Sequence, residues 1–221
     1  MITLVSRRGL HGLPLPRTRR DLIAMLRENP ERFTGRIATY DPARSGVGYF
    51  LLSQDDQYFE GFWRLAEVMG RLNVRQECCS DDMIAQLRAG EVLIAYNVVS
   101  SYVSRFAPDD PDLVRLSFED YTLALLRTAL IPRIAANPQA GAELLCHILS
   151  APIQRVIAEL SGTPLPEGSG PASAAHLRPI RLDAGLLAYG DQLRRAGALN
   201  EWAAAMSQPD QAPEPRPDGP K

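Results

Sequence analysis

The stretch GRIATYDPARSGVGY, residues 35–49, carries the main signal for the fold of this chain. Arg36 to Tyr40 is rich in residues that favour strands, and Asp41-Pro42 ends the run. Small residues then form a turn, and the apolar residues from Tyr49 onward start a helix. A strand, a tight turn and a helix in this order are typical of an α/β protein, so the fold class we expect is α/β.

Similar units continue on both sides of this stretch. Thr18 begins a helix with Asp21 three residues later, as in a capping box. Val92 to Tyr96 is an apolar, strand-like run, and Leu123 to Ile131 is another, although its leucines also suit a helix. The order of the strands in the sheet cannot be read from this pattern.

Polar residues before apolar runs predict where further helices begin. Asp55 or Asp56 is expected to cap one helix, and Ser80 the next. Asn137-Pro138 starts a later helix, because Pro is favoured in the first helical turn.

Apolar periodicity predicts two core-facing helices in the last third of the chain. Leu144, Leu145, Ile148 and Leu149 form a core stripe. Cys146 and His147 lie within it and are expected in or beside the core. Leu186 to Met206 is predicted as one amphipathic helix with Trp202 near its apolar side. Pro and charged residues dominate from Gln208 onward, so residues 208–221 are expected to be a disordered tail.

Composition limits the possible functions. The chain has 221 residues and a formal net charge of -2. This length suits one large domain or two small lobes. The charge argues against nucleic-acid binding, which needs a concentrated basic face. No stretch is apolar over the roughly 20 residues of a membrane span. Met1 to Val5 is too short an apolar run for a signal peptide, which by itself indicates the cytoplasm.

Known catalytic and metal-binding patterns do not occur in the sequence. The GxxxxGK[ST], GxGxxG, GxSxG and HExxH spacings are all missing. Cys78 and Cys79 are adjacent, which is not the ligand spacing of a structural zinc site. With Cys146 they make an odd number, so the cysteines cannot all pair within the chain. We therefore expect no catalytic residue, no metal and no cofactor, and we do not expect an enzyme.

The turn after Tyr40 is the first candidate binding site. Arg44, Ser45 and Gly46 stand where free backbone N–H groups and the helix dipole favour an anion. Arg44 adds positive charge and Ser45 a hydroxyl. The alternative is a tight connection that binds nothing.

Two further segments offer polar groups beside strands. Tyr96 and Asn97 end a strand, and groups at that position face a crevice in an open α/β sheet. Asn97 also suits a helix cap. Asp120 is the third candidate, and its alternative role is to start a strand.

Taken in order, several segments resemble one family, the solute-binding proteins of bacterial ABC transporters. Leu13 to Leu22 resembles the crossing from the first lobe to the second in the type 2 class of periplasmic binding proteins. Gly35 to Pro42, with Ser45-Gly46, resembles the ligand-facing loop of the second lobe. Gly90-Glu91 and Ala95 to Asn97 resemble the return crossing. The return to the first lobe is matched by Asp120–Thr122, Arg127–Pro132, Asn137-Pro138 and Leu149–Gln154. The resemblance runs from about Ile2 to Trp202 and is greatest with binders of ferric iron, phosphoglycerate and other organic anions.

This resemblance implies a periplasmic-binding-protein-like α/β fold with two lobes and a hinge, lacking the N-terminal part of the first lobe. The implied domains are a hinge strand and crossing at 1–16, the second lobe at 17–97, the return to the first lobe with the C-terminal helices at 98–207, and the tail at 208–221. First-lobe strands without their neighbours would expose unpaired edges and apolar faces.

The implied function is extracytoplasmic capture of a small anionic solute, a phosphorylated or carboxylated metabolite, by lobe closure in the periplasm. The implied ligand-binding residues are Arg44, Ser45, Gly46, Tyr96, Asn97 and Asp120. The implied partners are an ABC transporter permease and a sensor kinase, and the protein would be a monomer that binds no nucleic acid. Three alternatives stay open: a cytoplasmic α/β enzyme that holds a phosphate, a truncated fragment without function, and a ferric site built on Tyr96 and Tyr102.

Overall fold

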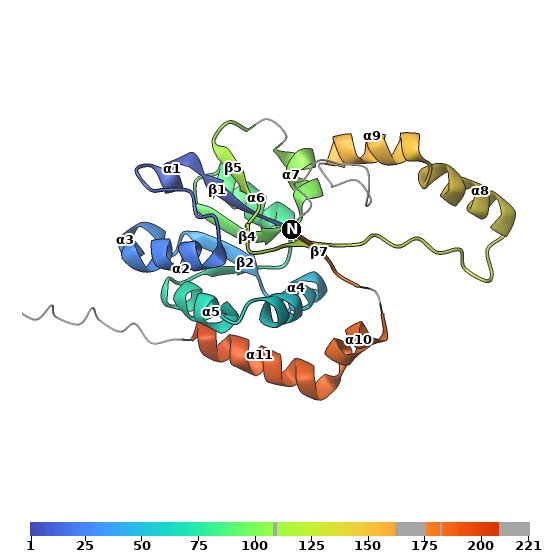
Figure 1. Cartoon of the computed structure of the whole chain (residues 1–221). Helices are drawn as coiled ribbons and strands as arrows, with labels where there is room; N and C mark the ends of the chain where they lie inside the picture. Colours follow the sequence, from blue (N-terminus) through green and yellow to red (C-terminus); the bar gives the residue numbers. More distant parts are fainter. Residues whose placement is uncertain (108–109, 162–175, 182, 208–221) are drawn as a thin grey trace, which may run out of the picture.

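The computed structural model describes residues 1–107, 110–161, 176–181 and 183–207. Its centre is a five-stranded sheet in the order β3-β2-β4-β1-β5. These strands span Ile2–Ser6 (β1), Ile37–Tyr40 (β2), Arg75–Glu77 (β3), Ile94–Val98 (β4) and Leu113–Leu116 (β5). β2 runs parallel to β3 and β4, whereas β1 lies antiparallel between β4 and β5. Strands alternate with helices along the chain (Figure 1), which confirms the α/β class.

Helices connect the strands and cover the sheet (Figure 1). They span Arg7–Leu10 (α1), Arg19–Glu28 (α2), Pro30–Phe33 (α3), Gly46–Tyr58 (α4), Phe62–Arg71 (α5), Ser80–Arg88 (α6) and Ser100–Phe106 (α7). The capping box predicted for α2 is confirmed: the Thr18 hydroxyl accepts from the Asp21 amide, and the Asp21 carboxylate accepts from the Thr18 amide.

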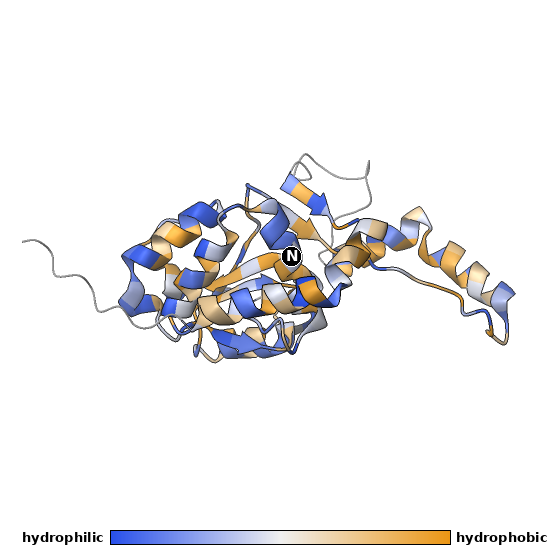
Figure 2. Ribbon diagram, turned by 90° about the horizontal axis from the view of Figure 1, so that it is seen from below, coloured by the Kyte–Doolittle hydropathy of each residue, from blue (hydrophilic) through white to orange (hydrophobic). Residues whose placement is uncertain are grey.

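One hydrophobic core lies between the sheet and the helices, visible as orange ribbon inside the body in Figure 2. It includes Leu4 of β1, Ile37 of β2 and Ile94 of β4, with Leu65 of α5 and Met83 of α6. Truncating one such leucine to alanine typically costs about 2–5 kcal/mol. This core therefore fixes the positions of the strands and of the loops at their ends.

α4 continues through Tyr58, so the prediction that Asp55 or Asp56 caps a helix is wrong. Asp55 lies inside the last turns of α4 and is completely buried. Gly61 precedes α5 instead. The prediction treated Asp55 as an exposed carboxylate before an apolar run, which favours a helix cap. Asp55 is instead buried against polar side chains from distant parts of the sequence, which the local pattern does not show.

The C-terminal segment returns to the same body. Its elements are Ala184–Leu187 (α10), the short 3-10 helix Ala188–Gly190 (η2) and Gln192–Met206 (α11). The prediction of one helix from Leu186 to Met206 is wrong, because Asp191 interrupts it and caps α11 with its side chain. α11 packs along α5, and its Trp202 is buried as predicted.

Two short strands, Thr122–Ala124 (β6) and Leu177–Pro179 (β7), pair in parallel as a second sheet, and Leu123 of β6 is buried in the same core. Between them in the chain, the helices Pro138–Ile148 (α8) and Ala151–Ser161 (α9) extend away from the body (Figure 1). Asn137 caps α8 with Pro138 in its first turn, as predicted. The expected element from Leu123 to Ile131 is strand only at its start, and the chain is irregular after Ala124.

The predicted core stripe on α8 is wrong. No residue of this helix is buried, and Leu144 and Leu149 are 58% and 70% exposed. Cys146 and His147, expected in or beside the core, are exposed as well. Apolar spacing defines one face of a helix, but no layer covers that face within the described residues.

β1 belongs to the same sheet as β2 and β4, so residues from the proposed hinge segment 1–16 and the proposed second lobe 17–97 share one core. The expected disordered tail at 208–221 lies outside the described residues. None of the helices described is long and apolar enough to span a membrane.

Candidate functional site

Three helices begin at one edge of the five-stranded sheet, the edge where the parallel strands β2, β3 and β4 end. α4 follows β2, α6 follows β3 and α7 follows β4. In an open α/β sheet, ligands bind outside the carboxyl ends of the strands. This edge is therefore the candidate site.

The loop between β2 and α4 is a tight, internally bonded turn. The Asp41 carbonyl accepts from the amides of Arg44 (3.2 Å) and Ser45 (2.8 Å). Ser45 Oγ caps α4 by accepting from the Gly48 amide at 3.1 Å. Gly48 is required here, because a Cβ would lie 2.7 Å from the Tyr40 Cβ.

This geometry leaves two donors free for a ligand. The amides of Gly46 and Val47 lie in the first turn of α4 and have no acceptor within the helix. Both residues are exposed, as is Arg44, whereas Ser45 is buried by its capping role. The structure thus brings together Arg44, Ser45 and Gly46, the three candidates from this loop, at a positively polarised helix end.

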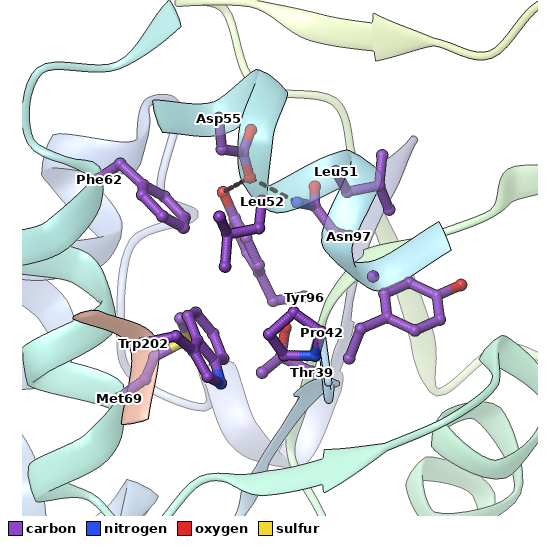
Figure 3. Close-up of a pocket in the computed structure, with 12 residues that line it drawn as sticks. Thr39, Pro42, Leu51, Leu52, Asp55, Phe62, Met69, Tyr96, Asn97 and Trp202 are labelled. Atoms are coloured by element: carbon purple, nitrogen blue, oxygen red, sulfur yellow. Dashed lines mark hydrogen bonds between the residues drawn. The ribbon is translucent and has the colours of Figure 1, made fainter. Parts of the chain in front are cut away.

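Behind this loop, the buried carboxylate of Asp55 is the centre of a hydrogen-bonded cluster. It accepts from Tyr96 Oη (2.9 Å), Asn97 Nδ2 (2.5 Å) and Tyr121 Oη (2.7 Å). Arg19 Nη2 lies 3.7 Å from its Oδ1. The bonds from Tyr96 and Asn97 are drawn in Figure 3. Three hydrogen bonds and one nearby positive charge therefore offset the desolvation of this carboxylate.

Arg19 is the positive member of this cluster and is 2% exposed. Its Nε donates to Tyr96 Oη (2.9 Å), and its Nη1 donates to Asp120 Oδ1 and to the Tyr121 carbonyl, both at 2.8 Å. The guanidinium also lies 3.6 Å from the centre of the Tyr121 ring. Although burial opposes its charge, Tyr96, Asp55, Tyr121 and Asp120 together raise the pKa of Arg19 above its usual value.

The tyrosines of the cluster stay neutral. Burial raises the pKa of Tyr96, with Arg19 opposing and Asp55 adding to the shift. Burial, followed by the Asp55 charge, raises the pKa of Tyr121 in the same way. Each phenol can therefore donate to Asp55, and every buried side-chain nitrogen or oxygen in the described residues has a hydrogen-bond partner.

The six residues predicted to bind ligand thus fall into two groups. Arg44, Ser45 and Gly46 lie at the α4 loop, whereas Tyr96, Asn97 and Asp120 direct their polar atoms into the Asp55 cluster. Asn97 has a left-handed backbone (φ 62°), a conformation that asparagine tolerates better than most residues.

Sequence reasoning missed Arg19 and Asp55, and it included Tyr121 only as the neighbour of Asp120 in the third candidate segment. One signal was present: Asp55 stands four residues after Leu51 and three after Leu52, both buried, so helical spacing puts it on the buried face of α4. The partners of a buried carboxylate come from other elements, and no local pattern identifies them.

A small cavity lies between α4, α5 and α11 (Figure 3). Its lining includes Leu52 and Asp55 of α4, Met69 of α5 and Trp202 of α11. The space that a water-sized sphere can reach is about 20 Å³, which holds about one water molecule. This cavity is too small for a metabolite, whereas the first turn of α4 beside it is exposed.

Ser80 links the ends of three strands beside this loop. It is the first residue of α6 rather than its cap, and Cys79 occupies the capping position. Ser80 Oγ lies 2.5 Å from Tyr40 Oη and accepts from the Val99 amide at 3.1 Å. Burial raises the pKa of Tyr40 to about 12, although its hydrogen bond with Ser80 opposes the shift.

No protein-family model and no curated protein sequence matches this chain. Solved structures do. The substrate-binding protein of an ABC transporter from Agrobacterium tumefaciens matches with a TM-score of 0.81 and 30% identity, over 93% of this chain and 63% of that one. This chain therefore spans less than two thirds of that protein's length.

Two more distant structures share the fold. A periplasmic thiamin-binding protein matches with a TM-score of 0.57 and 16% identity, over 94% of this chain and 64% of its own. The periplasmic binding protein AfuA from Actinobacillus pleuropneumoniae, bound to fructose-6-phosphate, matches with a TM-score of 0.58 and 16% identity, over 93% of this chain and 66% of its own.

These matches define the class of the fold: it is that of the periplasmic binding proteins. The first of these structures is described as a substrate-binding protein of an ABC transporter, and the other two as periplasmic binding proteins. The prediction of a non-enzymatic, periplasmic-binding-protein-like chain agrees with them.

Proposed function

We propose that this chain provides the ligand-capturing surface of an extracytoplasmic solute-binding protein of an ABC transporter, and that its ligand is a small anionic solute. The observation that carries the proposal is the α4 loop: two exposed first-turn amides, Gly46 and Val47, next to the exposed guanidinium of Arg44. Backbone donors at a helix N-terminus favour phosphate and carboxylate groups. A phosphorylated or carboxylated metabolite is the proposed ligand.

Tyr96, Asn97 and Asp120 support this surface from behind in our proposal. Asp55 holds Tyr96 and Asn97 at the end of β4, and Arg19 holds Asp120 in the segment that leads to β6. The same segment lies beside the chain that enters α2, since the Glu119 amide donates to the Arg17 carbonyl at 2.8 Å. We propose that the hinge lies at these two adjacent segments. The proposed partner, a transporter permease or a sensor kinase, would bind the closed form.

A ferric site on Tyr96 is the less favoured reading. The phenol of Tyr96 is fully engaged between Arg19 and Asp55, and burial raises its pKa, which opposes the phenolate that ferric iron binds.

The ligand class can be tested by thermal shift on this chain. The panel contains fructose 6-phosphate, 3-phosphoglycerate, citrate, ferric ion and neutral raffinose. We expect stabilisation by the phosphorylated or carboxylated compounds, of about 2.7 kcal/mol when the ligand is at a hundred times its Kd. Stabilisation by raffinose or ferric ion only, or by nothing in the panel, would contradict the anionic ligand.

Gly46→Pro tests the location of the site. Proline is favoured at the first helical position, and the extended backbone of Ser45 (φ -110°, ψ 116°) is compatible with a following proline. The variant thus removes one amide donor and keeps α4. A hydrogen bond to a charged group contributes about 1.5–3 kcal/mol, so affinity should fall about tenfold or more.

Arg44→Gln should weaken binding of the same ligand, whereas Arg27→Gln, the same change at an exposed position on α2, should not. Unchanged affinity in both Gly46→Pro and Arg44→Gln would remove the α4 loop from the binding site.

A further inference from the structure

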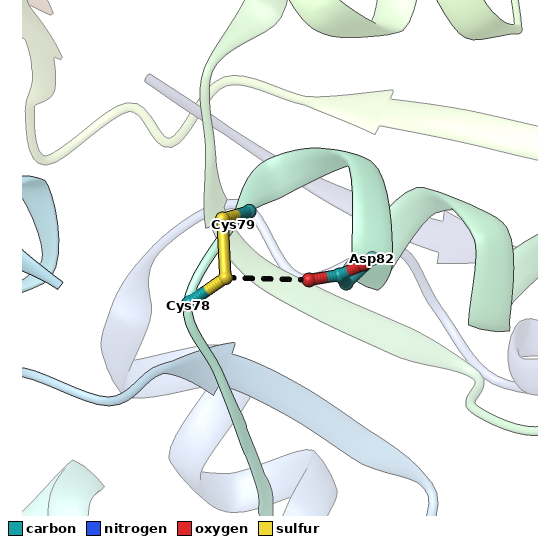
Figure 4. Close-up of side chains that lie close together, drawn as sticks. All are labelled: Cys78, Cys79 and Asp82. Carbon is teal, nitrogen blue, oxygen red and sulfur yellow. Dashed lines mark hydrogen bonds between the residues drawn. A yellow bond between two sulfur atoms is a disulfide. The ribbon is translucent and has the colours of Figure 1, made fainter. Parts of the chain in front are cut away.

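A disulfide joins the neighbouring residues Cys78 and Cys79 between β3 and α6 (Figure 4). It closes no loop, so it restricts the unfolded chain very little and contributes little stability by that route. Its position is more informative. Both cysteines are half-buried, and Asp82 of α6 is exposed next to them, with its Oδ2 3.4 Å from Cys78 Sγ. The bond is therefore not enclosed by the core.

The two residues that flank this pair are bonded to the α4 loop and its neighbours. On one side, the Glu77 carbonyl accepts from the Asp41 amide at 2.8 Å, where that loop begins. On the other side, Ser80 contacts Tyr40 and Val99 through its hydroxyl. The Cys78-Cys79 peptide thus lies between two fixed points, and the disulfide ring determines its conformation.

We propose that Cys78 and Cys79 form a redox-active pair, opened by a dithiol reductant, and that opening loosens the α4 loop. The first part is independent of what the loop binds. In the exchange, a thiolate of the reductant attacks Cys78 Sγ, the S–S bond breaks, and its electron pair goes to Cys79 Sγ. The second thiol of the reductant then attacks the mixed disulfide and releases Cys78. Two electrons and two protons pass to the pair, and the reductant leaves as a disulfide.

The surroundings favour Cys79 as the leaving thiolate. Cys79 is the N-cap of the nine-residue helix α6, whose first turn has no side-chain cap, so its amides can stabilise a negative sulfur. Cys78 differs, because the adjacent Asp82 carboxylate repels a thiolate and accepts an S–H instead. Once Cys79 has taken up its proton, the dithiol state has a thiol at Cys78 that donates to Asp82 and a second thiol at Cys79, at the start of α6.

Thiol trapping tests the redox activity. The chain carries Cys146→Ser, since Cys146 is an exposed free cysteine. It is equilibrated without denaturant in buffers of reduced and oxidised dithiothreitol, trapped with a maleimide and weighed by mass spectrometry. We expect two added maleimides under reducing conditions, none under oxidising ones, and a return to none on reoxidation. Labelling only in denaturant, or oxidation only to covalent dimers, would refute the pair.

Asp82→Asn tests the asymmetry within the pair. Removing the carboxylate beside Cys78 removes its repulsion of the attacking thiolate, so reduction should become several-fold faster. Asp81→Asn removes the same charge from the neighbouring position and is the matched control. Equal rates in the two variants would exclude the role given to Asp82.

Hydrogen exchange tests the coupling to the loop. On reduction, amides of residues 41–49 should exchange several-fold faster, whereas those of β1 and β5 should not change. Unchanged exchange in 41–49, with full thiol labelling, would leave a redox pair without the proposed coupling and would overturn the second half of the proposal.

Discussion

Asp55 shows how much of this molecule depends on a single side chain. Its carboxylate is inaccessible to solvent, and its hydrogen-bond partners come from β4 and from the segment before β6. Arg19 of α2 supplies the positive charge. Removing one partner from such a buried pair leaves an uncompensated charge, whereas the intact cluster has every polar atom satisfied.

Asp55→Asn should therefore lower the free energy of unfolding by about 3–5 kcal/mol. Asparagine keeps the size of the side chain but removes the charge that faces Arg19. Urea unfolding checks this, and the midpoint should fall with little change in slope. Asp56→Asn is the neighbouring control: Asp56 is exposed, and asparagine can still accept from Trp63 Nε1, so its cost should be within about 0.5 kcal/mol. Similar midpoints for the two variants would contradict the role of Asp55.

The buried phenol of Tyr40 makes the folded chain less stable at alkaline pH. Its pKa is about 12 in the folded protein and about 10 when unfolded. Below pH 10 the phenol is protonated in both states, and its contribution to stability is complete. Between about pH 10 and 12 the unfolded state binds fewer protons, so stability falls as pH rises, by roughly 1.4 kcal/mol per unit at most.

Tyr40→Phe removes this share of the pH dependence. The loss of stability between pH 10 and 12 should be smaller than in the unchanged chain, with the rest due to Tyr96 and Tyr121. Tyr58→Phe, at an exposed ring, is the control. The measurement is urea unfolding at several pH values, and equal slopes in Tyr40→Phe and Tyr58→Phe would rule the assignment out.

At the scale of the elements, α5 and α11 pack closely against each other. A Cβ on Gly70 of α5 would lie 2.1 Å from the Ala205 carbonyl oxygen of α11. Nearby, Trp202 lies parallel to Phe62 and donates from Nε1 to Gln76 Oε1 at 2.7 Å. Only glycine at position 70 lets the two backbones approach so closely.

Gly70→Ala should therefore displace α11 and destabilise the chain by about 1–3 kcal/mol, as overpacking does. Red-shifted Trp202 fluorescence and faster proteolysis of α11 would report the displacement. Gly197→Ala makes the same change on α11, where a Cβ meets nothing within 4 Å, and it should stabilise by up to about 1 kcal/mol through helix propensity. Destabilisation by both variants, or by neither, would argue against the contact.

Elements with a local cause could be predicted from the sequence. The strand, turn and helix at residues 36–49, the capping box of α2 and the start of α8 each depend on neighbours in the chain. The errors have distant causes. The hydrogen-bond partners of Asp55 come from β4 and from the segment before β6. The apolar spacing of α8 marks one face of that helix but does not indicate whether another element covers it. The loop half of the candidate site was therefore predictable, and its buried half was not.

At the scale of the whole molecule, apolar surface is unevenly distributed. Large apolar side chains form the core of the five-stranded body, whereas α8, α9 and the chain before them, whose ribbon carries many apolar residues (Figure 2), leave several of theirs exposed. The exposed residues include Leu130, Ile134, Leu144, Leu149 and Leu160. An apolar surface of this kind favours association.

We expect this chain to bind a hydrophobic dye such as ANS and to associate with rising concentration. The double variant Leu144→Lys/Leu149→Lys should reduce both effects, as measured by dye fluorescence and sedimentation velocity. Leu187→Lys/Leu193→Lys, at exposed leucines near and on α11, is the control and should change them less. Equal effects of the two double variants would show that the surface of α8 is not the cause.

The position of β1 has a consequence for the order in which the chain can fold during synthesis. Ile2 pairs with Val98, and Ser6 pairs with Leu113, so both neighbours of β1 are translated long after it. Until they emerge from the ribosome, β1 has two open edges, each able to pair with another chain. Contacts this distant in sequence also form slowly. The sheet can close only after β5 has been made, and chaperones that hold nascent chains would act on this protein in that interval.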